Sequence, residues 1–122
     1  MEKIEKTLRY TKLFNLYGAL LSSAQQEILK DYFFADLSIS EISENRSVSR
    51  AAVEDALTKG MKKLESIEET LKCLNKNEKI RAKVEELSQI VDDSEEKRLV
   101  KELMEELDNG IWESNWKTIS SL

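Results

Sequence analysis

Apolar residues recur every three or four positions along most of the chain, which is the spacing that places them on one face of an α-helix. The first stripe predicts a helix from Glu2 to about Tyr17. The segment LLSSAQQ then breaks the pattern, and Ser22 with Gln25, like Ser23 with Gln26, fits a capping box. A second helix should follow before FADLS interrupts it, with apolar residues at Ile28, Leu29, Tyr32 and Phe33.

Residues 37–60, LSISEISENRSVSRAAVEDALTKG, have the outline of two helices joined by a tight turn. Ser38 with Glu41 makes another capping-box match and opens a short helix that should reach about Asn45. The turn should begin there, and Ser49 can cap the next helix. The residues expected where the two helices cross are apolar or small: Ile39, Ile42, Ser43, Val48, Val53 and Ala56. The segment therefore predicts a helix-turn-helix.

The second helix of this motif should be long, because its apolar positions continue at a spacing close to a heptad repeat. These positions are Leu57, Met61, Leu64, Ile67, Leu71 and Leu74. Gly60 lies within the stripe and should be tolerated there, although a helical glycine costs about 1 kcal/mol relative to alanine. The stripe suits a seam between two copies of the chain and simple core packing equally well.

Two further helices are predicted in the remainder of the chain. The first covers about residues 80–91, and the second begins near Ser94 and ends near Gly110. The tail beyond contains Trp112 and Trp116, which should anchor it to the body of the protein or to a second subunit.

The composition favours an all-α protein. The 122 residues include no proline and only three glycines, the residues that break helices or form the tight turns of β-proteins. We expect two domains. Residues 1–74 would form a helix-turn-helix domain that includes the long connecting helix, and residues 75–122 would form an acidic C-terminal helical extension.

The reactive side chains are few. One cysteine and no histidine leave neither an intramolecular disulfide nor a Cys/His zinc site, and the commonest general base is absent. We therefore expect a protein that is not an enzyme, with no catalytic residue, metal or cofactor. The N-terminal segment is charged, and no apolar run approaches the roughly 20 residues that span a bilayer. We expect a cytoplasmic protein without membrane insertion.

Charge is distributed unevenly around the net value of −5. Residues 1–63 carry 10 basic and 9 acidic side chains, whereas residues 64–122 carry 9 basic and 15 acidic ones. An anionic partner should therefore bind the first half of the chain. The candidate nucleic-acid-binding residues all lie there: Arg46, Ser49, Arg50, Lys59, Lys62 and Lys63. Glu54 and Asp55, on the outward face of the same helix, oppose such binding because they would repel phosphates.

Three segments resemble the YlxM family of Gram-positive bacteria and mollicutes. NLYGALL, ADLSISEIS and VSRAAVEDAL correspond in order and spacing to the family's YGALLT, DDLSLGEIAE and GVSRQAVYD, and the resemblance covers about residues 3–75. Ser49 and Arg50 match the family's SR, and Asp55 matches its acidic position. Ser47 replaces the usual turn glycine, and Glu54 replaces a tyrosine. The middle segment also resembles region four of bacterial sigma factors.

The resemblance implies an all-α fold with a sigma-region-four-like helix-turn-helix that lacks a wing. It also implies a non-enzymatic accessory or regulatory role in the signal recognition particle pathway, because family members are encoded beside its GTPase or receptor. The implied partners are DNA or signal recognition particle RNA, and the particle's GTPase. The residues leave an alternative open: a helical interaction module that docks on that GTPase, with the helix-turn-helix as scaffold and the long helices as a homodimer seam.

Overall fold

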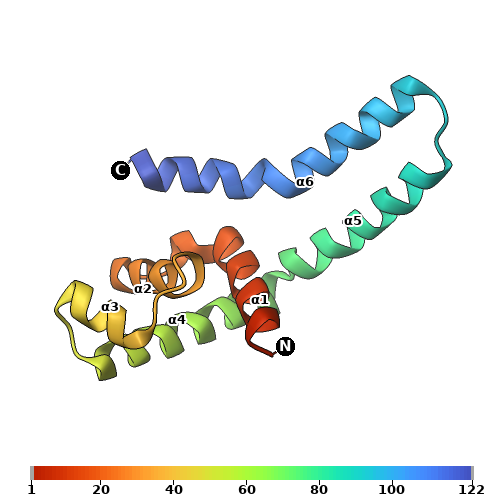
Figure 1. Ribbon diagram of the computed structural model, residues 1–122. Coiled ribbons are helices and arrows are strands. Elements are labelled where there is room, and N and C mark those ends of the chain that lie inside the picture. Colours follow the sequence, from red (N-terminus) through yellow and green to blue (C-terminus); the bar gives the residue numbers. More distant parts are fainter. Residues whose placement is uncertain (1, 122) are drawn as a thin grey trace. The chain divides into compact units, whose positions relative to one another are not determined.

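The computed structural model describes the backbone of residues 2–121 and the side chains of residues 3–107, and every regular element in this part of the chain is helical. The all-α prediction is thereby confirmed. The chain divides into two compact units, Met1–Leu71 and Lys72–Leu122 (Figure 1). The elements of the first unit are α1 (Glu2–Tyr17), η1 (Gly18–Leu20), α2 (Ser23–Leu29), η2 (Lys30–Phe34), α3 (Ile39–Arg46) and α4 (Arg50–Leu71). Those of the second are α5 (Cys73–Ile90) and α6 (Ser94–Ser121).

Two of the three predicted capping boxes form, those at Ser22 and Ser38, whereas Ser23 is the first residue of α2 and not its cap. The Ser22 hydroxyl accepts from the Gln25 amide while the Gln25 side chain accepts from the Ser22 amide, which starts α2. Ser38 and Glu41 exchange the same two hydrogen bonds at the start of α3. Each box satisfies two amides that a helix start would otherwise leave unpaired. These helix starts are therefore fixed by local side-chain chemistry.

A π-helical turn, η2, continues α2 and was not predicted from the sequence. The Ala35 amide donates to the carbonyl of Lys30, five residues earlier, at 3.0 Å. Asp36 then adopts a left-handed backbone (φ 56°), which ends the helix within the FADLS segment. The turn carries the aromatic side chains toward α1: the Phe33 ring stacks on Tyr10 with centroids 5.5 Å apart.

The turn between α3 and α4 is short and left-handed. Helix α3 extends to Arg46, one residue beyond the predicted end, and Ser47 takes the left-handed conformation (φ 54°, ψ 43°). The Ser43 hydroxyl donates to the carbonyl of Val48 and supports the turn. The Ser49 hydroxyl accepts from the Ala52 amide at 3.0 Å, which confirms Ser49 as the cap of α4. Helices α3 and α4 thus form the predicted helix-turn-helix.

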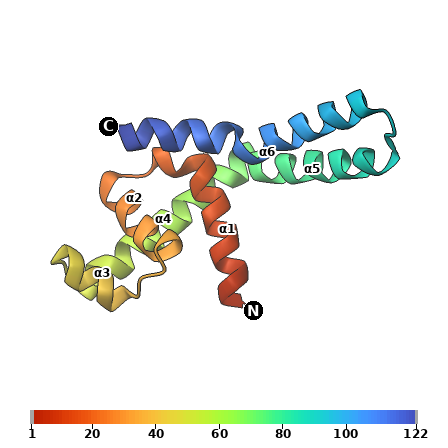
Figure 2. The same ribbon diagram turned by 45° about the horizontal axis from the view of Figure 1, so that its top comes forward.

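Helix α4 packs against α1, α2 and α3 and supplies one side of the first unit's core (Figures 1 and 2). The fully buried side chains come from all four helices: Leu13, Leu29, Ile42, Val53 and Leu64. Gly60 lies on the same buried face, where an added Cβ would be 2.7 Å from Leu29 Cδ1. The glycine therefore contributes to the packing, because the absence of a side chain lets α2 and α4 approach closely.

The long apolar stripe does not belong to one helix. Helix α4 ends at Leu71, and Lys72 adopts a left-handed backbone (φ 57°) before α5 begins. The expectation that the helix reaches Leu74 is therefore wrong. Leu57 and Leu64 are buried in the first unit, as core packing requires, whereas Leu74 is buried in the second.

The second unit consists of α5 and α6, which pack against each other. Within its described side chains the buried apolar residues are Leu74, Val84 and Val100. Other apolar side chains of these helices remain about half exposed, among them Ile80, Leu87, Leu99 and Leu103.

Helix α6 begins as predicted, at Ser94, but continues to Ser121 instead of ending near Gly110. A single glycine weakens a helix by about 1 kcal/mol relative to alanine, and this does not suffice to end it here. Trp112 and Trp116 lie outside the described side chains. No helix of the described residues is long and apolar enough to cross a membrane.

Candidate nucleic-acid interface

Two hollows adjoin the helix-turn-helix, both within the first unit. The first, which we call the α1–α3 hollow, has a volume of about 350 Å³. Its walls come from the start of α1, from η2, from the start of α3 with the segment before it, and from the first residue of α4. The cationic side chains that line it are Lys3, Lys6 and Arg50.

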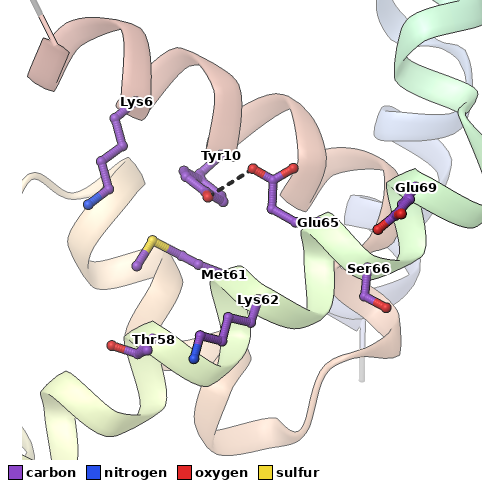
Figure 3. Close-up of a pocket in the computed structure, with 8 residues that line it drawn as sticks. All are labelled: Lys6, Tyr10, Thr58, Met61, Lys62, Glu65, Ser66 and Glu69. Carbon is purple, nitrogen blue, oxygen red and sulfur yellow. Dashed lines mark hydrogen bonds between the residues drawn. The ribbon is translucent and has the colours of Figure 1, made fainter.

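The second, the α1–α4 hollow, has a volume of about 400 Å³ and lies between α1 and the middle of α4 (Figure 3). Lys6 and Tyr10 line it from α1, and Met61 and Lys62 are among the residues that line it from α4 (Figure 3). Lys6 lines both hollows, so the two adjoin at its side chain.

Of the two carboxylates that line the α1–α4 hollow, Glu65 is engaged within the protein. Glu65 accepts from Arg9 Nε at 2.9 Å and from the Tyr10 hydroxyl at 2.9 Å. The hydrogen bonds from Arg9 lower the pKa of the Glu65 carboxyl, with a further contribution from Tyr10. Burial and the hydrogen bond to Glu65 raise the pKa of Tyr10. This group of three ties α1 to α4 across 56 residues of sequence and positions the helices that carry the lysines.

The α1–α3 hollow also contains two carboxylates, Asp36 and Glu41. The Glu41 carboxylate accepts from the Ser38 amide at 2.9 Å, and this hydrogen bond lowers its pKa. It therefore acts as part of the α3 cap while facing the three cations.

Of the predicted residues, Arg50 is the best placed. It is exposed at the first position of α4 and forms no ion pair within the described residues. The first residues of the second helix are the ones that contact bases when a helix-turn-helix docks in the major groove. Lys62 is exposed as well and lines the α1–α4 hollow.

Arg46 is engaged within the protein. Its guanidinium hydrogen-bonds to both carboxylate oxygens of Asp31 and donates to Glu27 at 2.9 Å. The Asp31 hydrogen bonds raise the pKa of Arg46. This clamp joins the end of α3 to α2 and η2, so Arg46 holds the helix-turn-helix against the rest of the unit.

The other three predicted residues have separate positions. The Ser49 hydroxyl caps α4. Lys59 Nζ lies 3.1 Å from an Asp55 carboxylate oxygen, one helical turn away, so each partly offsets the other's charge. Lys63 is exposed but lines neither hollow. Adjacent residues of an α-helix point about 100° apart, which separates it from Lys62.

Lys3 and Lys6 were not predicted. Their spacing of three places them on one face of α1, but every surface helix carries such pairs. Only the packing of α1 against α4 and η2 brings them to the same hollows as Arg50 and Lys62. Among the described residues, no three His, Cys, Asp or Glu side chains are placed to hold a metal ion together.

Helices α3 and α4, with the short turn between them, define a helix-turn-helix protein. A family profile described as "Putative helix-turn-helix protein, YlxM / p13 like" matches residues 4–107. Similar proteins include UPF0122 proteins of Bacillus cereus, Bacillus anthracis and Bacillus thuringiensis. Each is 37% identical over 109 residues, covering 86% of this chain and 99% of the relative. The chain belongs to the UPF0122 family, and the resemblance to YlxM is confirmed. That family is described by its helix-turn-helix and not by a catalytic activity.

Proposed function

We propose that the protein binds nucleic acid through its helix-turn-helix, with Arg50 as the principal contact. The observation that carries this proposal is the position of Arg50, exposed at the start of the second helix and grouped with Lys3 and Lys6 around one hollow. Arginine can bind guanine or phosphate through two hydrogen bonds. The ion pair between Lys59 and Asp55 also reduces the repulsion expected from the acidic pair Glu54 and Asp55.

We further propose that the protein is a cytoplasmic accessory or regulatory factor of the signal recognition particle pathway. What supports this role is the resemblance of NLYGALL, ADLSISEIS and VSRAAVEDAL to the YlxM family. The particle's RNA is then as strong a candidate ligand as duplex DNA, and the particle's GTPase is the candidate protein partner.

Fluorescence anisotropy of labelled signal recognition particle RNA and of a random DNA duplex, each across a salt series, tests the proposal. Binding should weaken steeply with salt because lysine and arginine displace counterions from phosphates. Arg50→Ala should weaken it by roughly 1–3 kcal/mol if Arg50 contacts bases. Lack of binding to both ligands at low salt would refute nucleic-acid binding, and an unchanged affinity of Arg50→Ala would remove Arg50 from the interface.

A second candidate function is a helical interaction module that docks on the GTPase. The half-exposed apolar residues of the second unit favour it, among them Ile80, Leu87 and Leu99. Association through such a surface, with the GTPase or with a second copy of the chain, should respond little to salt. Sedimentation of the protein alone and mixed with the GTPase, at low and high salt, separates this function from nucleic-acid binding.

A further inference from the structure

We propose that α1 carries half of a phosphodiester-binding site. Lys3 and Lys6 would bind the sugar–phosphate backbone together with Arg50 and Lys62, across the α1–α3 and α1–α4 hollows. This inference rests on the proposed nucleic-acid-binding function. It adds that the backbone is held by a helix outside the helix-turn-helix.

The first step is the convergence of charge from two separate helices. Lys3 and Lys6 are three residues apart and exposed, and both line the α1–α3 hollow opposite Arg50. A phosphodiester carries one negative charge and accepts hydrogen bonds in several directions. Two ammonium groups and one guanidinium supply the charge and the donors that such a group binds.

The second step is continuity between the hollows. Lys6 belongs to both, and Lys62 stands across the α1–α4 hollow from it, on α4 (Figure 3). A nucleic-acid strand presents its charges in series, one per nucleotide. The cations run from the first hollow through Lys6 to Lys62. Such a row fits the successive phosphates of a strand better than it fits one small anion.

The third step is the balance of charge that remains. Lys3, Lys6, Arg50 and Lys62 form no ion pair within the described residues. The carboxylates facing them are Asp36 and Glu41 in the first hollow, and Glu65 and Glu69 in the second. Glu41 accepts from the Ser38 amide, and Glu65 is bound by Arg9 and Tyr10. Counting Lys6 once, the lining side chains carry four positive and four negative charges, and Arg9, which is bound to Glu65, leaves a balance of one positive charge.

The fourth step is that the helix-turn-helix alone offers fewer cations than its sequence suggests. Arg46 is held by Asp31 and Glu27, and Lys59 is paired with Asp55. Of the basic residues predicted to bind, Arg50 and Lys62 are the two that line the hollows. Both hollows open beside α1, so its lysines supply the additional contacts.

The test compares two charge-matched double variants of the full chain. Lys3→Gln/Lys6→Gln removes the α1 half of the proposed site, and Lys97→Gln/Lys101→Gln removes two exposed lysines from α6 in the second unit. Both are titrated against labelled signal recognition particle RNA and a random DNA duplex across a salt series. Circular dichroism and thermal melting establish that each variant is folded.

The α1 variant should lower the slope of log affinity against log salt by about two units on duplex DNA, because each lost phosphate contact contributes roughly 0.9. Its affinity at low salt should fall on the order of tenfold. The α6 variant should leave both quantities unchanged. Lys3→Arg/Lys6→Arg, which keeps the charge, should bind as the wild type does.

Each outcome is decisive. If the wild type binds and the α1 variant keeps its slope, this inference is overturned while the proposed function stands. Equal losses in the α1 and α6 variants also overturn it, because they would indicate a non-local charge effect. If the wild type binds neither nucleic acid, both proposals fail. If the double variant does not fold, the single variants Lys3→Gln and Lys6→Gln decide, with one slope unit expected from each.

Discussion

The two units of the chain are both helical, yet their described residues are stabilised in different ways. In the first unit, helices distant in sequence share a continuous apolar core, and ion pairs join different helices: Arg9 with Glu65, and Arg46 with Asp31. In the second unit, fewer of the side chains that the structure describes are apolar and buried. Its ion pairs include ones within a single helix, such as those of Arg98 with Glu95 and Glu102, three and four residues away.

The difference shows which kind of interaction specifies a tertiary arrangement. Pairs within a helix support that helix by about 0.2–0.5 kcal/mol each but do not place it against another. Pairs and buried side chains between helices select one arrangement, and the proposed nucleic-acid site depends on such an arrangement of α1 with α4. The chain also provides separate probes, because its three tyrosines (Tyr10, Tyr17 and Tyr32) lie in the first unit and both tryptophans in the second.

The largest difference between the units should appear on truncation of a leucine. Leu64 is fully buried in the first unit, so Leu64→Ala should cost about 2–5 kcal/mol of unfolding free energy. Leu99 is 49% exposed in α6, so Leu99→Ala should lower the unfolding free energy by less than about 1 kcal/mol. Denaturant unfolding followed by tyrosine near-ultraviolet circular dichroism and by tryptophan fluorescence measures both. Similar losses for the two variants would contradict the contrast drawn above.

A smaller difference should separate two arginines. Arg46→Gln removes the clamp to Asp31, whose side chain is only 19% exposed, and should cost about 1–2 kcal/mol. Arg98→Gln, which removes solvent-exposed ion pairs within α6, should lower the unfolding free energy by less than Arg46→Gln does. The same unfolding measurements apply, and a double-mutant cycle with Asp31→Asn isolates the clamp. An Arg46 variant as stable as the wild type would argue against this structural role.

The smallest effect concerns the loss of stability of the first unit at acidic pH. Because the folded-state pKa of Glu65 lies below its unfolded value, the Arg9 and Tyr10 contacts stabilise the first unit at neutral pH. That contribution should fade as the pH falls below about 4.5, through the folded-state pKa. It should be small, since the Glu65 side chain is 36% exposed and screened by solvent. Unfolding from neutral to acidic pH should therefore depend less on pH in Glu65→Gln than in wild type. Identical profiles would show that Glu65 contributes nothing.

The sequence predicted best what depends on neighbouring residues. The capping boxes at Ser22 and Ser38 and the cap at Ser49 are formed by side chains within three residues of the amides they satisfy. The prediction failed at the end of α4, because an apolar stripe carries no mark of the left-handed backbone at Lys72. Leu74 continues the spacing of the stripe but is buried in a different unit.

The candidate site was predictable only in part, for the same reason. Arg50 follows from its place in the motif. The engagement of Arg46 by Asp31 and the convergence of Lys3 and Lys6 on Arg50 depend on contacts between residues 15 to almost 50 positions apart. A local pattern cannot encode those arrangements, which result from the packing of α1 and α3 against α4.

Because of the π turn η2, the effect of deleting one residue between Ser23 and Phe34 depends on where the deletion falls. A π turn contains one residue more than an α turn, so deleting a residue within Lys30–Phe34 would allow an ordinary α-helix to form there. Five residues of a π turn cover about the same rotation as four residues of an α turn, so the residues on either side of the deletion would keep their faces. Only the side chains inside the turn would be re-aimed, among them Phe33, which stacks on Tyr10, and Phe34, whose ring contacts Phe14 edge-on. A one-residue deletion in η2 should therefore disrupt the unit less than a deletion within α2, which would rotate every later side chain by about 100°.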